Sequence, residues 1–444
     1  MEFDTGGTSK SLLAGGDPAT LSDNVRLVTG HAADHRLIYE LLRTNSAAPS
    51  AESFSSSLDE PSYEPTDRLL IKRGTQLLGH VQVVHRTAWF HGVRLPVASL
   101  ERLATLPELR DAGYDRLLFS AAEQSLRPTS AVVAFARTDR VEMFRAAGWS
   151  ELTPPQHTEA NVHEVLARLA TNQDESYALA ARRQRPLRIR HWRHVELEPL
   201  LEVARQSASS TWGGLDRSEA YWRWLVGRKT HDALIVAIDG RDDWDSLDTP
   251  SHIVGYIIAR GPQLLELGTL SGCARAAEPL LARACQDAIE RDYRAISLHS
   301  PPDDPLHQLL LAAGGDWLQR RHNGTGWLIK LLDPPRWIAN MYPVLLQRSR
   351  SAEFARPLSI GFDAGRIKYR LELTRRSGHL LVDHAAPADV TCSPSTLSAL
   401  FLGNLDLVDA QQTGRIHFNS HEIAVRVAAL FPQVACWQSQ IDML

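Results

Sequence analysis

The feature that most constrains the fold is a repeat of predicted elements on the scale of a whole domain. Residues 25–155 predict a strand, a helix, a three-strand meander, a turn leading into a second helix, and then a further strand and helix. Residues 187–331 predict much the same order, with Trp327–Leu331 as the closing strand of the second copy. A repeat of this size indicates two domains of one architecture in tandem.

The composition is typical of a protein with several globular domains. The chain has 444 residues, of which 43% are hydrophobic and 23% are charged, and this length predicts about three domains. A net charge of −4 argues against a nucleic-acid partner. The cysteines form no CxxC pair and the histidines form no ligand set, which favours a reducing cytoplasm and no metal site. No apolar run approaches the roughly 20 residues of a membrane span, so we expect no membrane partner.

A short turn in the first copy carries the pattern Pro107-x-x-Arg110-x-x-Gly113. It follows the predicted meander strand Val93–Thr105 and precedes a helix. A strand, a glycine turn and a helix in this order present backbone N–H groups and a helix N-terminus to a pyrophosphate. Gly113 would let the backbone approach such a ligand closely. On the local sequence alone, an ordinary strand-to-helix turn is the alternative interpretation.

The meander, this turn and the ending Met143–Trp149 together resemble the GCN5-related N-acetyltransferase fold over residues 25–155. In that family the turn binds the pyrophosphate of acetyl-coenzyme A (acetyl-CoA), and the ending is usually Tyr-x-x-x-Gly-aromatic. In the second copy, Ser271–Ala277 replaces the Arg-x-x-Gly turn. The resemblance therefore implies a coenzyme site in the first copy and a degenerate second copy that closes the substrate pocket.

The last part of the chain predicts an amphipathic helix, a strand meander and two further helices, which resembles the sterol carrier protein fold. Tandem acetyltransferase domains followed by this fold are similar to the Eis (enhanced intracellular survival) family. There the last domain serves as a cap, and an apolar ligand in it is the alternative. The predicted fold class is α/β (α+β), with a disordered tail (1–24), an acetyltransferase domain (25–155), a second, degenerate one (156–335) and a sterol carrier protein-like domain (336–444).

The resemblance also implies which residues would bind the coenzyme. Backbone groups of Leu103, Ala104 and Thr105 would meet the pantetheine arm. Because the family's turn is usually rich in arginine, the two aspartates here predict weaker binding, by about 1 kcal/mol each where partly shielded. Arg102, Arg116 and Arg127 are expected to offset them in part. The residues expected to meet the pyrophosphate are Arg110, Asp111, Ala112, Gly113, Tyr114 and Asp115.

Three residues are candidates for the catalytic chemistry. Phe144 aligns with the family's tyrosine that protonates the leaving thiolate, but phenylalanine has no ionisable proton, and packing in the core is the alternative. By resemblance, the carboxylate of Leu444 would help to deprotonate the amine, with a frayed terminus as the alternative. Glu101 is a second possible base, unless it only pairs with Arg86 or Arg102.

These residues predict an acetyl-CoA-dependent N-acetyltransferase that acts on a primary amine of a small molecule or peptide. Acetyl-CoA would be a co-substrate, and no metal is implied. The alternative is a weakened or inactive acetyltransferase-fold protein that binds a ligand or acts as a scaffold. By family resemblance we also expect a homo-oligomer, a hexamer in the Eis-like proteins.

Overall fold

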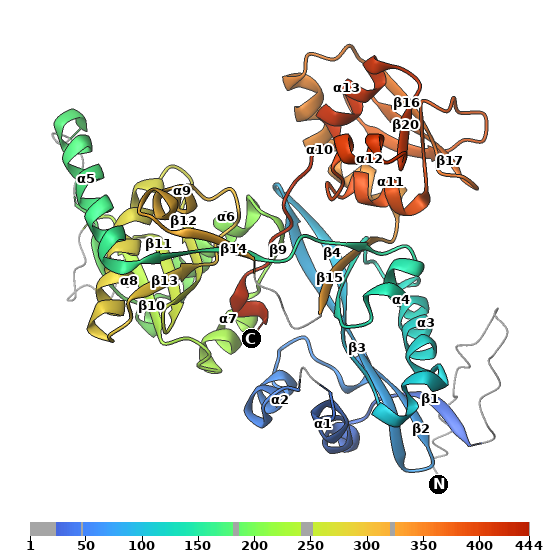
Figure 1. The fold of residues 1–444 in the computed structure, drawn as a ribbon, viewed down its shortest axis with the longest axis horizontal. Coiled ribbons are helices and arrows are strands. Elements are labelled where there is room, and N and C mark those ends of the chain that lie inside the picture. The colour runs from blue at the N-terminus through green and yellow to red at the C-terminus, as the bar shows by residue number, and fades with distance from the viewer. Residues whose placement is uncertain (1–23, 46–47, 181–185, 241–251, 320–324, 444) are drawn as a thin grey trace, which may run out of the picture.

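The structure is a computed structural model that describes residues 24–45, 48–180, 186–240, 252–319 and 325–443. These residues form three lobes, each built on one sheet (Figure 1). The predicted disordered tail lies outside the described residues except for Asn24. Among the helices in these ranges, none is long and apolar enough to cross a membrane.

The first lobe contains the predicted meander. Strands β2, β3 and β4 are antiparallel neighbours, joined at Gly74 and Gly92, whose positive φ suits tight hairpin turns. Helices α1 and α2 pack on one face of the sheet and α3 and α4 on the other. The elements are β1 (Val25–Thr29), α1 (His35–Arg43), α2 (Ala51–Leu58), β2 (Arg68–Arg73), β3 (Gln76–Phe90), β4 (Val93–Thr105), α3 (Tyr114–Leu126), β5 (Val133–Thr138), α4 (Val141–Ala146) and β6 (Ser150–Glu151).

Helix α2 lies in a stretch, Asn45–Pro65, for which the sequence predicts only a polar loop. Its first turn is fixed by Ser50, whose hydroxyl accepts a hydrogen bond from the backbone N–H of Ser53 (3.0 Å). Phe54 is its buried residue and packs beside α1. One apolar anchor gives no helical periodicity, so the sequence pattern could not reveal this helix.

The second lobe repeats the architecture of the first. Its sheet has α5, α8 and α9 on one face and α6 and α7 on the other. The elements are β7 (Gln156–Asn161), α5 (Val162–Ala180), β8 (Arg188–His191), α6 (Leu197–Ser209), β9 (Trp212–Leu215), α7 (Glu219–Gly227), β10 (Ala233–Ile238), β11 (Ile253–Arg260), β12 (Gln263–Thr269), α8 (Ala277–Glu290), β13 (Ala295–Leu298), α9 (Pro305–Ala312) and β14 (Asp316–Gln319).

The predicted closing strand of the second copy pairs in the first sheet. β15 (Gly326–Leu331) pairs with β5 and β6 in the first sheet, in the order β1-β2-β3-β4-β5-β15-β6. β7 takes the matching place in the second sheet, in the order β14-β7-β13-β12-β11-β10-β8. The prediction that Trp327–Leu331 closes the second copy is therefore wrong. β9, also from the second copy, pairs with β3. The first sheet therefore contains two strands of the second copy, β9 and β15.

The third lobe packs against one end of the first sheet. Phe90 at the end of β3 meets Trp212 and Trp337, with ring centroids 5.4 and 5.0 Å apart. Its sheet has the order β18-β17-β16-β19-β20. The elements are α10 (Pro334–Ser351), β16 (Leu358–Asp363), β17 (Lys368–Leu373), β18 (Gly378–Val382), β19 (Val390–Cys392), α11 (Pro394–Phe401), α12 (Leu407–Gln412), β20 (Ile416–Phe418) and α13 (His421–Leu430).

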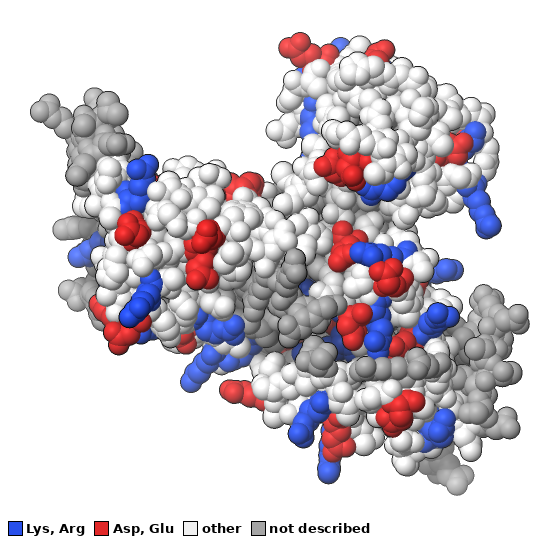
Figure 2. Space-filling model, viewed as in Figure 1, with Lys and Arg blue, Asp and Glu red and all other residues white. Residues whose placement is uncertain are grey.

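Surface charge is mixed on the face drawn in Figure 2. Lysine and arginine side chains lie among aspartate and glutamate side chains over all three lobes of this face, without one large patch of a single sign. A nucleic-acid surface needs a basic patch or stripe, and this face offers none.

Candidate active site

The centre of the candidate site is the point where two parallel strands separate. β4 and β5 pair from Val97↔Val133 to Leu100↔Ala136, where their pairing ends within the described residues. β4 continues to Thr105, paired with β3 on its other side. Residues Glu101–Thr105 therefore border an opening in the sheet, and backbone groups on that edge are available to a ligand.

A β-bulge shapes β4 at this opening. Gln82 pairs with Glu101 and His80 with Ala104, so that two residues of β4 lie opposite one residue of β3. Arg102, within the bulge, has a φ of +54°, which is uncommon for a residue other than glycine. Bulges re-aim side chains and interrupt pairing, and this one lies directly beside the separating strands.

His80 holds the bulge from inside the sheet. Its Nδ1 donates to the carbonyl oxygen of Arg102 (3.0 Å), and its Nε2 accepts from the guanidinium of Arg68 (2.9 Å). The partners fix this tautomer, because a carbonyl only accepts and a guanidinium only donates. Complete burial, and next the charge of Arg68, keep the pKa of His80 well below its usual 6.5. His80 is therefore a neutral structural group at neutral pH.

The predicted phosphate-type turn follows β4. A short 3₁₀ helix, Pro107–Ala112, leads to Gly113, which has a φ of +80° and immediately precedes α3. A Cβ at Gly113 would meet nothing within 4 Å, so glycine is required here for its backbone conformation rather than for space.

We expect Gly113→Ala to weaken acetyl-CoA binding about 10-fold, because the strained turn would shift the backbone N–H groups. Gly92→Ala is a matched control: its φ is +84°, its Cβ would also meet nothing within 4 Å, and it lies in the β3–β4 hairpin. Both changes should destabilise folding by about 1–2 kcal/mol. Isothermal titration calorimetry and thermal unfolding measure the two effects, and equal affinities in the two variants would contradict a role for the turn.

Asp115, expected from the sequence to weaken pyrophosphate binding, is paired in the structure. It is buried in the first turn of α3, where the hydroxyl of Thr105 donates to one carboxylate oxygen (2.5 Å) and Arg140 Nε to the other (2.7 Å). Its partner is Arg140, at the start of α4, and not one of the three arginines named above. Because Thr105 ends β4 and Arg140 follows β5, this hydrogen-bonded group spans the two sides of the opening.

The other predicted coenzyme residues lie along the same edge. Leu103 is half-buried, Ala104 is buried against α1, and Tyr114 lies half-buried at the start of α3. Ala112 is exposed in the turn. The side chains of Arg110 and Asp111 lie outside the described part of the structure.

Phe144 packs in the core between α3 and α4. It is 1% exposed, and its ring lies 4.3 Å from Phe119 and 5.1 Å from Trp149, measured between centroids. These contacts are those of the core alternative, and this side chain offers no proton to a leaving group.

Phe144→Tyr should therefore lower stability by about 1–3 kcal/mol, because it buries a hydroxyl among apolar rings, without raising the rate of acetyl transfer. Thermal unfolding and turnover measure both effects. Phe418→Tyr on β20, where the ring is half-buried, controls for the added hydroxyl. A clear gain in rate would instead show that Phe144 replaces a lost catalytic acid.

A cluster of charged and aromatic side chains lies on the α1–α2 side of the opening. Arg86 on β3 donates to both carboxylate oxygens of Glu60 (3.0 Å each) and lies 3.7 Å from Glu101. The Tyr221 ring of α7, in the second lobe, lies 5.7 Å from the Arg86 guanidinium carbon. The hydroxyl of Tyr221 is buried and has no hydrogen-bond partner among the described residues. Burial, and next the charge of Asp442, raise the pKa of Tyr221 far above its usual value, so this hydroxyl stays protonated.

The end of the described chain reaches the same cluster. Arg228 of α7 donates to the carbonyl oxygen of Ile441 (2.7 Å), and Arg137 of β5 donates to Sδ of Met443 (2.6 Å). Leu444, the predicted base, lies outside the described residues. The sequence predicted neither the pairing of Arg140 with Asp115 nor the contact of Tyr221 with Arg86. Both contacts join segments that are distant in the sequence.

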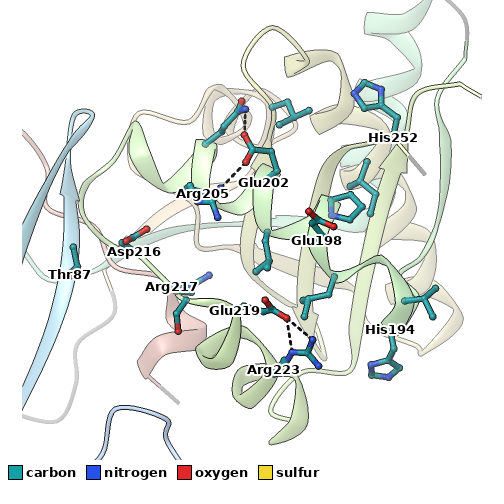
Figure 3. A pocket seen from close by; sticks show the side chains of 18 of the residues that line it. Thr87, His194, Glu198, Glu202, Arg205, Asp216, Arg217, Glu219, Arg223 and His252 are labelled. Atoms are coloured by element: carbon teal, nitrogen blue, oxygen red, sulfur yellow. Dashed lines mark hydrogen bonds and ion pairs between the residues drawn. The ribbon is translucent and has the colours of Figure 1, made fainter. Parts of the chain in front are cut away.

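A wide groove of about 1550 Å³ lies elsewhere, between α6, α7 and the tip of the β3–β4 hairpin (Figure 3). Its charged side chains pair with one another, as Glu202 does with Arg205 and Glu219 with Arg223 (Figure 3). None of the predicted coenzyme or catalytic residues lines it.

Comparison with solved structures identifies the architecture. A GCN5-related N-acetyltransferase from Anabaena variabilis superposes with a TM-score of 0.69 and 15% identity, covering 93% of this chain and 99% of that one. The chain has the acetyltransferase fold. A GCN5-related N-acetyltransferase from Kribbella flavida (TM-score 0.66, 15% identity, 93% and 97% covered) and Eis1 from Mycobacterium abscessus (TM-score 0.59, 15% identity, 94% and 97% covered) are also similar.

The third lobe is identified independently of these structures. Residues 361–439 match the sterol carrier protein domain family. A comparison with curated protein sequences gives no match. The predicted fold class and the predicted Eis-like architecture, with tandem acetyltransferase folds and a sterol carrier protein domain, are thus confirmed.

Proposed function

We propose that this protein is an acetyl-CoA-dependent N-acetyltransferase that modifies a primary amine of a small molecule or peptide. The observation that carries the proposal is the separation of β4 and β5 after Leu100, followed by the bulge and the left-handed Gly113 turn. An acyl-CoA thioester placed in this opening would meet backbone groups of Glu101–Thr105. Its pyrophosphate would meet the N-terminus of α3. The cytoplasmic location and the homo-oligomer stay predictions.

Glu101 is the residue we assign as the base. The amine nitrogen attacks the thioester carbonyl carbon, the C–N bond forms, and the C–S bond breaks. Glu101 is part-exposed beside the opening and takes the proton from the amine, directly or through one water. Arg86 forms its two short hydrogen bonds with Glu60 and lies farther from Glu101, which leaves the Glu101 carboxylate available. The thiolate takes a proton from solvent.

The test has two stages. Isothermal titration calorimetry with acetyl-CoA measures binding, and a thiol-release assay over polyamines, aminoglycosides and lysine peptides measures transfer. We expect one acetyl-CoA per chain and thiol release with at least one class of amine. Absence of binding at high micromolar acetyl-CoA would reject the proposal.

A second candidate function is ligand binding or scaffolding without turnover. The pair of Asp115 with Arg140 across the opening favours it, because the carboxylate engages an arginine that a pyrophosphate would otherwise bind. We expect Asp115→Asn to tighten acetyl-CoA binding about 10-fold, since it removes a negative charge and leaves Arg140 for the phosphates. Arg140→Gln should weaken binding. If neither variant binds acetyl-CoA measurably, the scaffold alternative is favoured.

A further inference from the structure

The second copy has kept an opening like that of the first. β12 and β13 are parallel and pair at Gln263↔Ser297 and Leu264↔Leu298. β12 then runs on to Thr269 beside β11 alone. As in the first sheet, the strand that follows the meander therefore has one edge unpaired beyond the point of separation.

The segment Trp437–Met443 lies across this second opening. Trp437 Nε1 donates to the carbonyl oxygen of His299, the residue after β13 (3.1 Å). Farther along, Ile441 is fully buried in the same cluster as Leu265 of β12 and Tyr256 of β11. The segment thus contacts both strands that border the opening, and Figure 1 shows it between the second lobe and the first sheet.

Arg217 fixes this segment to the sheet. Its guanidinium donates to both oxygens of Glu266 on β12 (2.8 and 2.6 Å) and to both oxygens of Asp442 (2.9 and 2.8 Å). The side chains of Arg217, Glu266 and Asp442 are only 8%, 5% and 3% exposed. Each carboxylate makes two hydrogen bonds with the buried guanidinium, and paired bonds of this kind fix the relative orientation of the two groups. The Asp442 side chain therefore has one well-defined position.

The far end of the segment reaches the first copy. Met443 contacts Arg137 of β5, and Arg228 holds the backbone at Ile441 while its guanidinium lies 4.4 Å from the centroid of the Trp224 ring. Trp224 in turn donates to the carbonyl oxygen of Ser56 in α2 (2.9 Å). The segment is therefore held by the second copy and placed on the α1–α2 side of the first opening, near Glu60 and Arg86, where the amine would bind in the proposed function.

We propose that the opening of the second copy is a binding site for the segment Trp437–Met443, and that Arg217 is the positioning residue that sets one wall of the acceptor pocket. The second opening is then filled by the protein itself and takes no coenzyme. The role in acceptor binding rests on the proposed acetyltransferase function, whereas the binding of the segment does not.

Arg217→Met in the full-length chain tests both parts, with Arg223→Met as the control. Arg223 lies on the adjacent helix α7, is 69% exposed and pairs with Glu219. In Arg217→Met we expect hydrogen–deuterium exchange of residues 437–443 to rise about 10-fold or more, and KM for the amine to rise about 10-fold. The Kd for acetyl-CoA should change less than about twofold. Arg223→Met should change none of these.

A second variant covers the case in which Arg217→Met fails to fold. Asp442→Asn keeps the shape and leaves Arg217 paired with Glu266, and it should raise exchange in the segment and KM in the same direction. Unchanged exchange in both variants would overturn the binding of the segment, and so would two acetyl-CoA molecules per wild-type chain. Raised exchange with an unchanged KM would overturn the positioning role. Failure of the wild type to bind acetyl-CoA would reject the proposed function and leave the exchange result valid.

Discussion

Glu101→Gln should lower kcat for amine acetylation by about 100-fold or more, the range typical of losing a general base. Glu101 lies directly after the last β4–β5 pair, and its part-exposed carboxylate lies 3.7 Å from Arg86 beside the opening. Glutamine keeps the shape but accepts no proton at neutral pH. The Kd for acetyl-CoA should change little, because the coenzyme would contact the backbone of β4 rather than this carboxylate.

The pH profile separates catalysis from a structural effect. The acid limb of the pH profile of kcat/KM should vanish in Glu101→Gln. Glu52→Gln, on the exposed side of α2, changes a carboxylate of the same lobe away from the opening and should leave the profile intact. An acid limb that persists in Glu101→Gln would transfer the role of base to another group.

Local sequence patterns predicted the parts of the fold that depend on neighbouring residues. The meander from Arg68 to Thr105 consists of apolar-rich runs with glycine at both hairpin turns, and Gly113 marks a position with positive φ. These features depend on backbone conformation and burial within one segment. The apolar pattern and the turn residues of that segment therefore predict them directly.

Sheet partners could not be predicted in the same way. β15 was predicted as a strand of the second copy, yet it pairs in the first sheet, and β7, which the sequence analysis did not predict, takes the matching place in the second sheet. The residues of β15 would satisfy either sheet, because a buried apolar strand has no local feature that names its neighbour. The placing of these strands depends on how the linker at residues 152–155 crosses between the two sheets.

The charge interactions of the site were predicted least well, because they too depend on contacts between distant parts of the chain. Asp115 was expected to repel the pyrophosphate, but its charge is shared with Arg140, which lies on a different element. Tyr221 and Arg217 stand in the second copy and act on residues more than a hundred positions away. The sign and size of a charge effect depend on such distant partners. A short sequence motif therefore does not predict the electrostatics of a site to which two lobes contribute.

Acidification should loosen the candidate site through His80. Because burial and Arg68 keep its pKa well below 6.5 in the folded protein, the unfolded chain binds one more proton than the folded one below that pH. Stability is then fully present above pH 6.5 and falls by about 1.4 kcal/mol per pH unit below it, until the folded pKa is reached. Urea unfolding at a series of pH values measures it.

The variant His80→Gln isolates this contribution. A glutamine keeps one donor for Arg102 and one acceptor for Arg68 but does not titrate, so the fall in stability below pH 6.5 should be smaller in this variant. His231, whose pKa burial also lowers, lies in the second lobe, and His231→Gln should change stability without changing acetyl-CoA binding. Since His80 holds the bulge at Arg102, the wild type and His231→Gln should both lose acetyl-CoA affinity at pH 5, whereas His80→Gln should retain it. Equal losses in all three would place the pH sensitivity outside the bulge.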